Sequence, residues 1–193
     1  MKEVLISIQP YWVFLIIARK MGWDIGKEKT IEVRKNFPKD ESWNRKAEIY
    51  CSKDKKSFNC IPKEYQPLMK KFLSKVIGKF TCDSIEIFTG FDLLYGHYVQ
   101  DYTQISQNEL LNYKGKNDFL YGWHISHLKI YGKPRELSEF YTWKKCNSCR
   151  ETGYESTACC FDIDCKAPAV ITRPPQSWCY VEVQNVQNDK DLL

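Results

Sequence analysis

Residues 28–35 read EKTIEVRK, a run in which polar and apolar side chains alternate. In a β-strand, Ile31 and Val33 point to one face of the sheet. The other face then carries the polar side chains of the run, namely Thr30, Glu32 and Arg34. On pattern alone the simplest interpretation is a solvated strand edge, with a surface ion pair between Glu32 and Arg34 worth at most about 1 kcal/mol. The alternative is that this polar row belongs to a site.

The residues before this run predict a strand followed by a helix. Residues 4–8 read VLISI, Pro10 suits the first turn of a helix, and the apolar residues that follow carry the helix to Gly22. The apolar stretch from Val4 to Ile17 is too short for a membrane span and is interrupted by polar residues. It also lacks the basic start and the small-residue cleavage site of a signal peptide. We therefore expect a cytoplasmic protein that does not enter a membrane.

The residues after this run predict short strands with helices between them. An amphipathic row indicates a helix over 61–75, and a second helix has Ser106 as N-cap, Glu109 in a capping box and Gly115 beyond its end. Further strands are predicted over 47–53, 76–88, 121–132 and 173–183, with one helical turn at 134–140. This order is not the regular alternation of a doubly wound sheet. We predict an α+β fold, a small and partly open β-barrel of five or six strands with two or three helices.

The composition is that of an ordinary globular domain. The chain has 193 residues, of which 43% are hydrophobic and 27% are charged. This length predicts a single domain over residues 1–193. The formal net charge of +5 allows an anionic partner such as RNA or DNA, although it is well below that of a histone-like binder.

Five of the nine cysteines fall between Cys146 and Cys165. Thiols clustered at short spacing in a reducing compartment favour a metal over a disulfide framework. The sequence predicts a zinc site whose ligands are Cys146 and Cys149 in CxxC spacing, with Cys160 and Cys165 as the second pair. Cys159 can replace Cys160, and disulfides or buried free thiols are the alternatives. Four thiolates leave no open coordination position, so this zinc would be structural, within an insertion over residues 144–167.

Six segments spread along the chain read LISIQPYWVFLI, GKEKTIEVRKNFP, AEIYCS, VIGKFTCDSIEIF, YGWHISHLKIYGKPRELSEF and RPPQSWCYVEV. Together they resemble an ASCH domain of the kind met in bacterial and phage genomes. The most specific piece, GKEKTIEVR, is similar to the family signature G-x-K-x-x-E-x-R, although Gly26 lies one residue early here. ASCH domains resemble the PUA superfamily of small β-barrels associated with RNA binding. The resemblance implies a PUA-like barrel over nearly the whole chain, with the cysteine segment inserted before the last strand.

The resemblance also implies that the polar row faces a cleft that binds RNA or a nucleotide-like ligand. Arg34 can make planar, bidentate contacts, Glu32 can accept a hydrogen bond from an exocyclic amine, and Lys29 can meet a phosphate. These three side chains are the expected ligand-binding residues. Stacking faces for a base are offered by Trp12, Trp123 and Trp178, although a core role is the simpler expectation for each.

An enzymatic alternative comes from one branch of the family, small amidohydrolases that deacylate N4-acetylcytidine with a Lys, a Thr and a later Glu. Lys29 matches that Lys, Glu32 occupies the place of the Thr, and the later Glu has no identified counterpart. In this alternative a desolvated Lys29 is the base or nucleophile on an N4-acylated cytidine-type nucleoside, with Glu32 as proton shuttle. A third interpretation is an interaction protein that docks a protein partner through an apolar patch on the zinc insertion.

Overall fold

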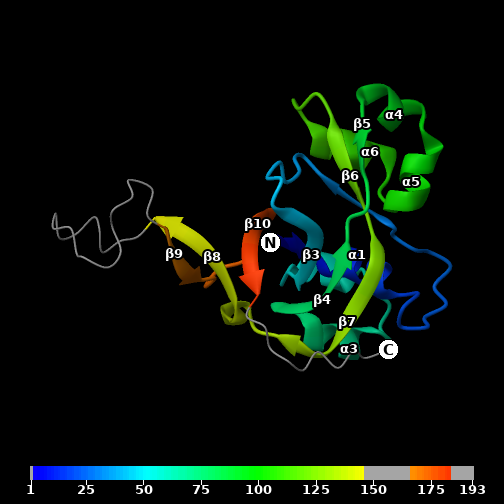
Figure 1. Ribbon diagram of the computed structural model, residues 1–193. Coiled ribbons are helices and arrows are strands. Elements are labelled where there is room, and N and C mark those ends of the chain that lie inside the picture. Colours follow the sequence, from blue (N-terminus) through cyan, green and yellow to red (C-terminus); the bar gives the residue numbers. More distant parts are fainter. Residues whose placement is uncertain (1, 146–165, 184–193) are drawn as a thin grey trace, which may run out of the picture.

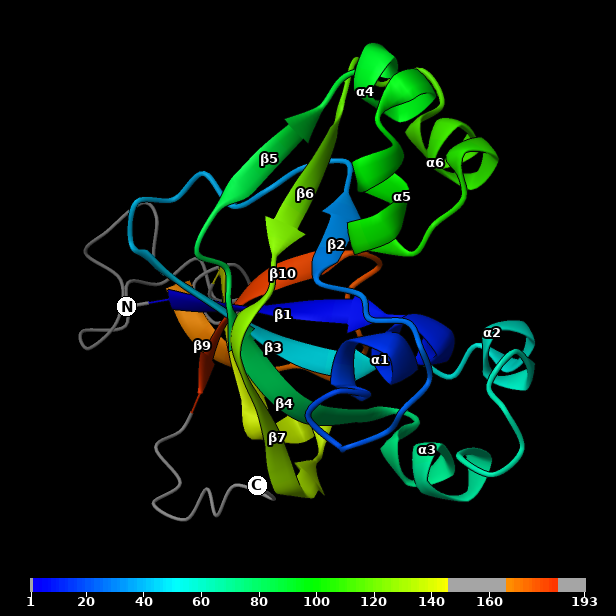
Figure 2. The same ribbon diagram turned by 90° about the vertical axis from the view of Figure 1, so that its right-hand side faces the viewer.

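The computed structural model describes residues 2–145 and 166–183, which form two sheets flanked by helices (Figures 1 and 2). The larger sheet has seven strands, in the spatial order β7 (Ser126–Arg135), β4 (Lys75–Thr81), β3 (Trp43–Cys51), β1 (Lys2–Ile8), β10 (Trp178–Val183), β8 (Phe140–Lys145) and β9 (Lys166–Val170). The smaller sheet has three strands, in the order β2 (Ile31–Arg34), β6 (Leu120–His124) and β5 (Ile85–Phe88). In the described part of the chain β7 and β9 are edge strands, so the larger sheet is not closed into a barrel.

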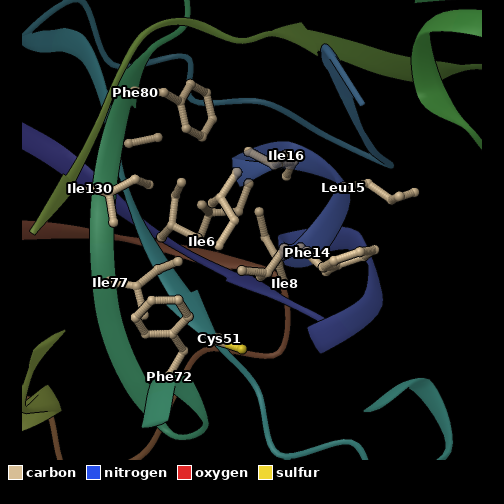
Figure 3. Close-up of a cluster of buried hydrophobic side chains, with 14 of the residues drawn as sticks. Ile6, Ile8, Phe14, Leu15, Ile16, Cys51, Phe72, Ile77, Phe80 and Ile130 are labelled. Atoms are coloured by element: carbon tan, nitrogen blue, oxygen red, sulfur yellow. The ribbon is translucent and has the colours of Figure 1, made fainter. Parts of the chain in front are cut away.

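Strand β1 lies in the middle of the larger sheet and is parallel to β3 and antiparallel to β10. Its even-numbered residues face helix α1 (Pro10–Ile17), and the apolar core is built around this contact (Figure 3). The same core receives side chains from β3, β4 and β7, and from helix α3 (Gln66–Phe72). The opposite face of the sheet is also buried, because Leu5 and Val181 pack there with Phe140. Both faces of β1 are therefore covered, which explains its almost continuous apolar sequence.

Strands β5 and β6 and three helices form a unit that we call the arm, residues 85–124, which projects from the larger sheet (Figure 2). Its helices are α4 (Gly90–Tyr95), α5 (His97–Thr103) and α6 (Gln107–Lys114). Strand β2 completes the sheet, and its residues Ile31 and Val33 enter the arm's own core with Phe88. Gly122 is required there, because a Cβ atom at this position would come within 2.6 Å of the Phe88 ring. The capping box predicted at Ser106 and Glu109 is present at the start of α6.

Two long strands of the prediction are each divided between the two sheets. The segment 76–88 leaves the larger sheet at the end of β4 and enters the smaller one as β5, and the segment 121–132 crosses back between β6 and β7. The change of direction lies at residues 82–84 and at Ile125, where no breaker residue marks it. The apolar pattern continues across both breaks because each half contributes to a buried core, as Phe80 does in the larger sheet and Phe88 does in the arm.

The prediction of five or six strands and two or three helices was too low. The described residues form ten strands and six α-helices, together with the single turn of 3-10 helix η1 (Leu137–Glu139) that was expected near 134–140. Most of the missed elements are short, such as α2 (Lys55–Asn59), α4 and β9. A segment of five or six residues is too short to display a helical period, so its sequence does not distinguish it from a loop. The α+β class itself is confirmed.

The cysteine segment falls outside the described residues, and with it the predicted zinc ligands Cys146, Cys149, Cys160 and Cys165, and the alternative ligand Cys159. The strands on either side of it are described, and β8 and β9 pair antiparallel with Lys145 opposite Lys166. Within residues 2–145 and 166–183, no three His, Cys, Asp or Glu side chains gather to hold a metal. No helix in these ranges is long and apolar enough to cross a membrane.

Candidate functional site

The three predicted site residues are brought together and buried. The exposed fractions are 1% for Lys29, 5% for Glu32 and 8% for Arg34. Strand β2 places the glutamate and the arginine two residues apart on one face, and the carboxylate lies between the two cations. Glu32 Oε1 is 2.8 Å from Arg34 Nη2, and Glu32 Oε2 is 3.5 Å from Lys29 Nζ. The interpretation as a solvated edge is therefore wrong, because the larger sheet and the arm cover this face of β2.

Lys29 is the deepest member of the row. Its Nζ donates a hydrogen bond to the carbonyl oxygen of Thr103 at 2.8 Å and lies 5.3 Å from the centre of the Trp12 ring. Thr103 is the last residue of α5, so the ammonium group meets the negative end of that helix. Burial lowers the pKa of Lys29 to about 8, against the attraction of Glu32, which raises it. The turn before Lys29 uses Gly26 at a φ of 63°, a left-handed conformation that suits the glycine of the signature.

Arg34 connects the arm to the larger sheet. Its Nη2 donates to the carbonyl oxygen of Ser7 at 2.7 Å, near the end of β1, as well as pairing with Glu32. Two buried atoms of this network, Arg34 Nε and Glu32 Oε2, have no hydrogen-bond partner among the described residues. The network therefore holds unused capacity for one more donor and one more acceptor.

A cavity of about 720 Å³ lies beside this row, between the larger sheet and the arm. Its wall includes Glu32 and Arg34 from β2, and Glu109, Leu110 and Tyr113 from α6. The other side is built by the end of β1, the start of α1 and the loops that follow β3 and β9, namely Ser7, Gln9, Trp12, Ser52, Asp54 and Pro174 to Gln176. A volume of this size suits a small organic molecule, since pockets for such ligands span roughly 300–1,000 Å³.

The charges on the wall are mainly acidic. Glu32, Asp54 and Glu109 contribute three carboxylates, against the single guanidinium of Arg34, which is already paired with Glu32. Lys29 does not belong to the wall, because its side chain is fully enclosed behind Trp12 and Glu32. The cavity therefore favours a neutral or cationic group, and a phosphate inside it would meet repulsion.

The three tryptophans proposed for stacking have different positions. Trp12 lines the cavity. Trp123 is fully buried in the core, and Trp178 packs on it with ring centres 6.0 Å apart while its Nε1 donates to Asn36. The simpler expectation of a core role is confirmed for Trp123.

Sequence reasoning did not place two of the acidic wall residues, Asp54 and Glu109, in the site. Asp54 is the N-cap of α2 and accepts a hydrogen bond from Ser57 N, and Glu109 closes the capping box of α6. Both have a local role that fully accounts for their residue type. Only the approach of the arm to the larger sheet makes them neighbours, and no local pattern carries that information.

The comparisons with known proteins address the fold. The sequence matches no protein-family model, and no curated protein is similar to it in sequence. Among solved structures, ASCH from Zymomonas mobilis matches with a TM-score of 0.53 at 15% identity, over 94% of this chain and 88% of that one. The chain has the fold of an ASCH protein. A tyrosine-to-phenylalanine mutant of ZmASCH gives a TM-score of 0.51 at 14% identity, again over 94% of this chain and over 91% of the other.

These matches support the ASCH fold that the resemblance implied, whereas the larger sheet of the described residues is not the closed barrel of that resemblance. A serine-to-alanine mutant of ZmASCH agrees, with a TM-score of 0.52 at 16% identity over 94% of this chain and 89% of the other. Identities this low establish the fold alone. The role of the cavity therefore has to be argued from its own residues.

Proposed function

We propose that the cavity beside Lys29, Glu32 and Arg34 binds the base of RNA or of a nucleotide-like ligand. The observation that carries this proposal is the buried carboxylate of Glu32, held between two cations at the wall of a cavity of about 720 Å³. A carboxylate fixed in this way is an acceptor for the exocyclic amine of cytosine or adenine. The ASCH fold and the net charge of +5 agree with a nucleic-acid-type ligand.

The cavity wall has groups for both the aromatic faces and the hydrogen-bonding edge of a base. Trp12 and Tyr113 offer aromatic rings to its faces, and Leu110 adds apolar surface. Arg34 lines the cavity, so its guanidinium can donate to a ring nitrogen or carbonyl of the base. The acidic wall places any phosphate outside the cavity, so the base enters and the backbone stays at the mouth.

Binding of free nucleosides tests this proposal. Titration calorimetry with cytidine, adenosine and uridine should give tighter binding of the two nucleosides that carry an amine, by about tenfold over uridine. Glu32→Gln should remove this preference, because an amide no longer offers a charged acceptor. Glu41→Gln, an exposed position outside the cavity, is the matched control and should bind as the wild type does. No heat and no melting shift with any nucleoside or short single-stranded RNA would contradict the proposal.

The amidohydrolase alternative has less support. A lysine with its pKa lowered to about 8 can act as a base, and this is the observation in its favour. Its Nζ, however, already donates to Thr103 and is enclosed behind the wall, out of reach of a substrate carbonyl in the cavity. Incubation with N4-acetylcytidine decides the matter, since release of acetate that is lost in Lys29→Ala would establish the alternative.

We also propose that Cys146, Cys149, Cys160 and Cys165 bind a structural zinc ion. The support is the CxxC spacing and the pairing of Lys145 with Lys166, which brings the two ends of the cysteine segment to one point. Metal analysis of protein prepared with zinc should give one zinc per chain, and Cys149→Ser should lose it. Protein without zinc after such a preparation would end this proposal.

A further inference from the structure

Two segments of the chain have strongly opposed charge. Residues 80–113 contain five acidic residues and no lysine or arginine. Residues 53–75 contain seven lysines and two acidic residues, Asp54 and Glu64. The first segment builds most of the arm, and the second builds α2, α3 and the start of β4. The molecule therefore has one acidic and one basic region.

The acidic region also exposes large apolar side chains on α4 and α5. Phe91 is 71% exposed and Tyr95 is 66% exposed, and their rings contact each other with centres 4.9 Å apart. Leu94, Tyr98 and Tyr102 on the same two helices are exposed as well. We call these five residues the aromatic surface of the arm. Monomeric proteins seldom leave so many large apolar side chains in contact with water on neighbouring helices.

The basic region presents an exposed row of lysines. Lys55 and Lys56 lie on α2, Lys70 and Lys71 lie in the last turn of α3, and Lys63 lies between the two helices. We call these five residues the lysine surface. Lysine side chains carry long apolar stems beneath a cationic head, so they can cover aromatic rings while they pair with carboxylates.

The two surfaces lie on different parts of the fold. Figure 2 shows α4, α5 and α6 in the upper part of the molecule and α3 in the lower part, with α2 at a height between them. Helices α4 and α5 pack on each other and on the smaller sheet, whereas α2 packs on α1 and α3 packs on β4. Among residues 2–145 and 166–183, the fold therefore leaves two complementary surfaces without a partner.

We propose that copies of this chain associate head to tail, with the aromatic surface of one arm against the lysine surface of the next copy. The aromatic rings supply the apolar contact, and Asp101 on α5 supplies a carboxylate for a lysine head. Because the two surfaces consist of different residues, the contact is heterologous and leaves one surface of each kind free to bind further copies. This proposal is independent of the ligand in the cavity.

A second copy fits the aromatic surface better than a nucleic acid does. Rings that stack on bases are normally accompanied by cations along the backbone, whereas α4 and α5 carry no lysine or arginine, and the lysines of the arm, Lys114 and Lys116, lie at and beyond the end of α6. The lysine surface alone could attract RNA, and the experiment separates that case because RNA binding there would not need the arm.

Sedimentation of the full chain in low salt is the first measurement. Between about 5 and 500 μM, the weight-average mass should rise above that of one chain, because contacts of this kind are weak. Raising the salt to about 0.5 M should weaken the association at least tenfold, since exposed charges are screened over a few ångströms at that ionic strength.

Two one-sided variants make the test specific. Phe91→Ser with Asp101→Lys removes the arm side, and Lys63→Glu with Lys70→Glu removes the lysine side. Each double variant alone should stay monomeric, and an equimolar mixture should form a dimer of one copy of each, because one intact surface of each kind remains. Lys20→Glu with Lys39→Glu changes the net charge equally at exposed lysines outside the lysine surface, and should associate as the wild type does.

Three results would overturn the proposal. The first is a wild-type chain that stays monomeric at 500 μM in low salt. The second is association that survives in either one-sided variant alone. The third is a mixture of the two variants that stays monomeric while each variant keeps the circular dichroism spectrum of the wild type. Circular dichroism thereby separates loss of the contact from loss of folding.

Discussion

Two buried glutamates on strands of this protein have different surroundings. Glu32 on β2 lies between Lys29 and Arg34 at the wall of a cavity. Glu48 on β3 is fully buried against the second core of the larger sheet, where it accepts a hydrogen bond from the Tyr131 hydroxyl at 2.6 Å. Burial raises the pKa of Glu48 to about 8, and the nearby Glu3 adds to the effect. Glu32 stays charged between two cations and is therefore suited to bind a ligand. Glu48 has only a hydroxyl as its partner, so its protonation makes the stability of the fold depend on pH.

The largest effect on stability should come from removing Arg34, the cation nearer to Glu32. Arg34→Ala leaves Glu32 buried with only the more distant Lys29, and also removes the hydrogen bond to Ser7. We expect the free energy of unfolding to fall by about 3–5 kcal/mol, measured by urea denaturation at pH 7. Arg19→Ala, which removes an exposed ion pair with Glu28, should cost at most about 1 kcal/mol. Equal costs for the two variants would contradict the central role given to Arg34.

The buried carboxyl group of Glu48 should make the free energy of unfolding fall as pH rises. Above about pH 4.5 the unfolded chain releases the Glu48 proton, while the folded protein keeps it until about pH 8. The folded state therefore binds more protons in this window, and the free energy of unfolding decreases with pH, by about 3 kcal/mol between pH 5 and pH 8.

Glu48→Gln should abolish most of that decrease, because glutamine does not titrate. Denaturation at pH 5 and at pH 8 measures the difference for both proteins. A wild-type decrease that persists unchanged in the variant would assign the pH dependence to other groups.

A smaller effect on stability is expected from removing Lys29, the second cation beside Glu32. Lys29→Met keeps an unbranched side chain up to Cε, removes the ammonium group, and leaves Glu32 paired with Arg34 at 2.8 Å. The variant loses the hydrogen bond to Thr103, but it also no longer buries a charged ammonium group, which is unfavourable. We therefore expect the free energy of unfolding to fall by about 1–2 kcal/mol at pH 7.

The pH dependence of Lys29 has the opposite sign to that of Glu48. The folded protein releases the lysine proton at about pH 8, whereas the unfolded chain keeps it to about pH 10.5. The unfolded state binds more protons in this window, so this residue makes stability rise with pH between pH 8 and pH 10.5. Lys29→Met should remove that rise, as measured by denaturation at pH 8 and at pH 10. A variant that keeps the wild-type slope would show that Lys29 is not the titrating group.

The sequence predicted the elements that have a strong local signal. The strand over 4–8, the helix after Pro10 and the helix that begins after Ser106 are all present, because each has a turn, cap or proline at its boundary. The helix after Pro10 is shorter than predicted, since it ends at Ile17 and not at Gly22. It also predicted that Lys29, Glu32 and Arg34 belong together, since a signature motif fixes their spacing, with Lys29 two residues before β2 and the other two on it. Their burial was not predictable from that spacing, because the arm that covers them is more than fifty residues away in the sequence.

What the sequence could not supply is the division of the chain between two sheets. In the sequence, the paired strands β5 and β6 lie between the paired strands β4 and β7. The segments 76–88 and 121–132, each predicted as one strand, therefore cross from one sheet to the other. The cavity lies where the sheets separate, and its wall joins β2 to residues on α6 and in the loops that follow β3 and β9. Such a site depends on contacts between distant segments, which local patterns do not encode.

The pairing of β1 has a consequence for how the protein is made. This first strand lies between β3 and β10, so one of its edges is paired by a strand that is synthesised soon after it, and the other edge by residues 178–181. During translation the edge facing β10 remains open until that strand leaves the ribosome. An open edge on an apolar strand is a template for wrong pairing with other chains. We therefore expect the nascent chain to depend on holding chaperones until β10 closes the sheet, and truncation before β10 to give an aggregating product.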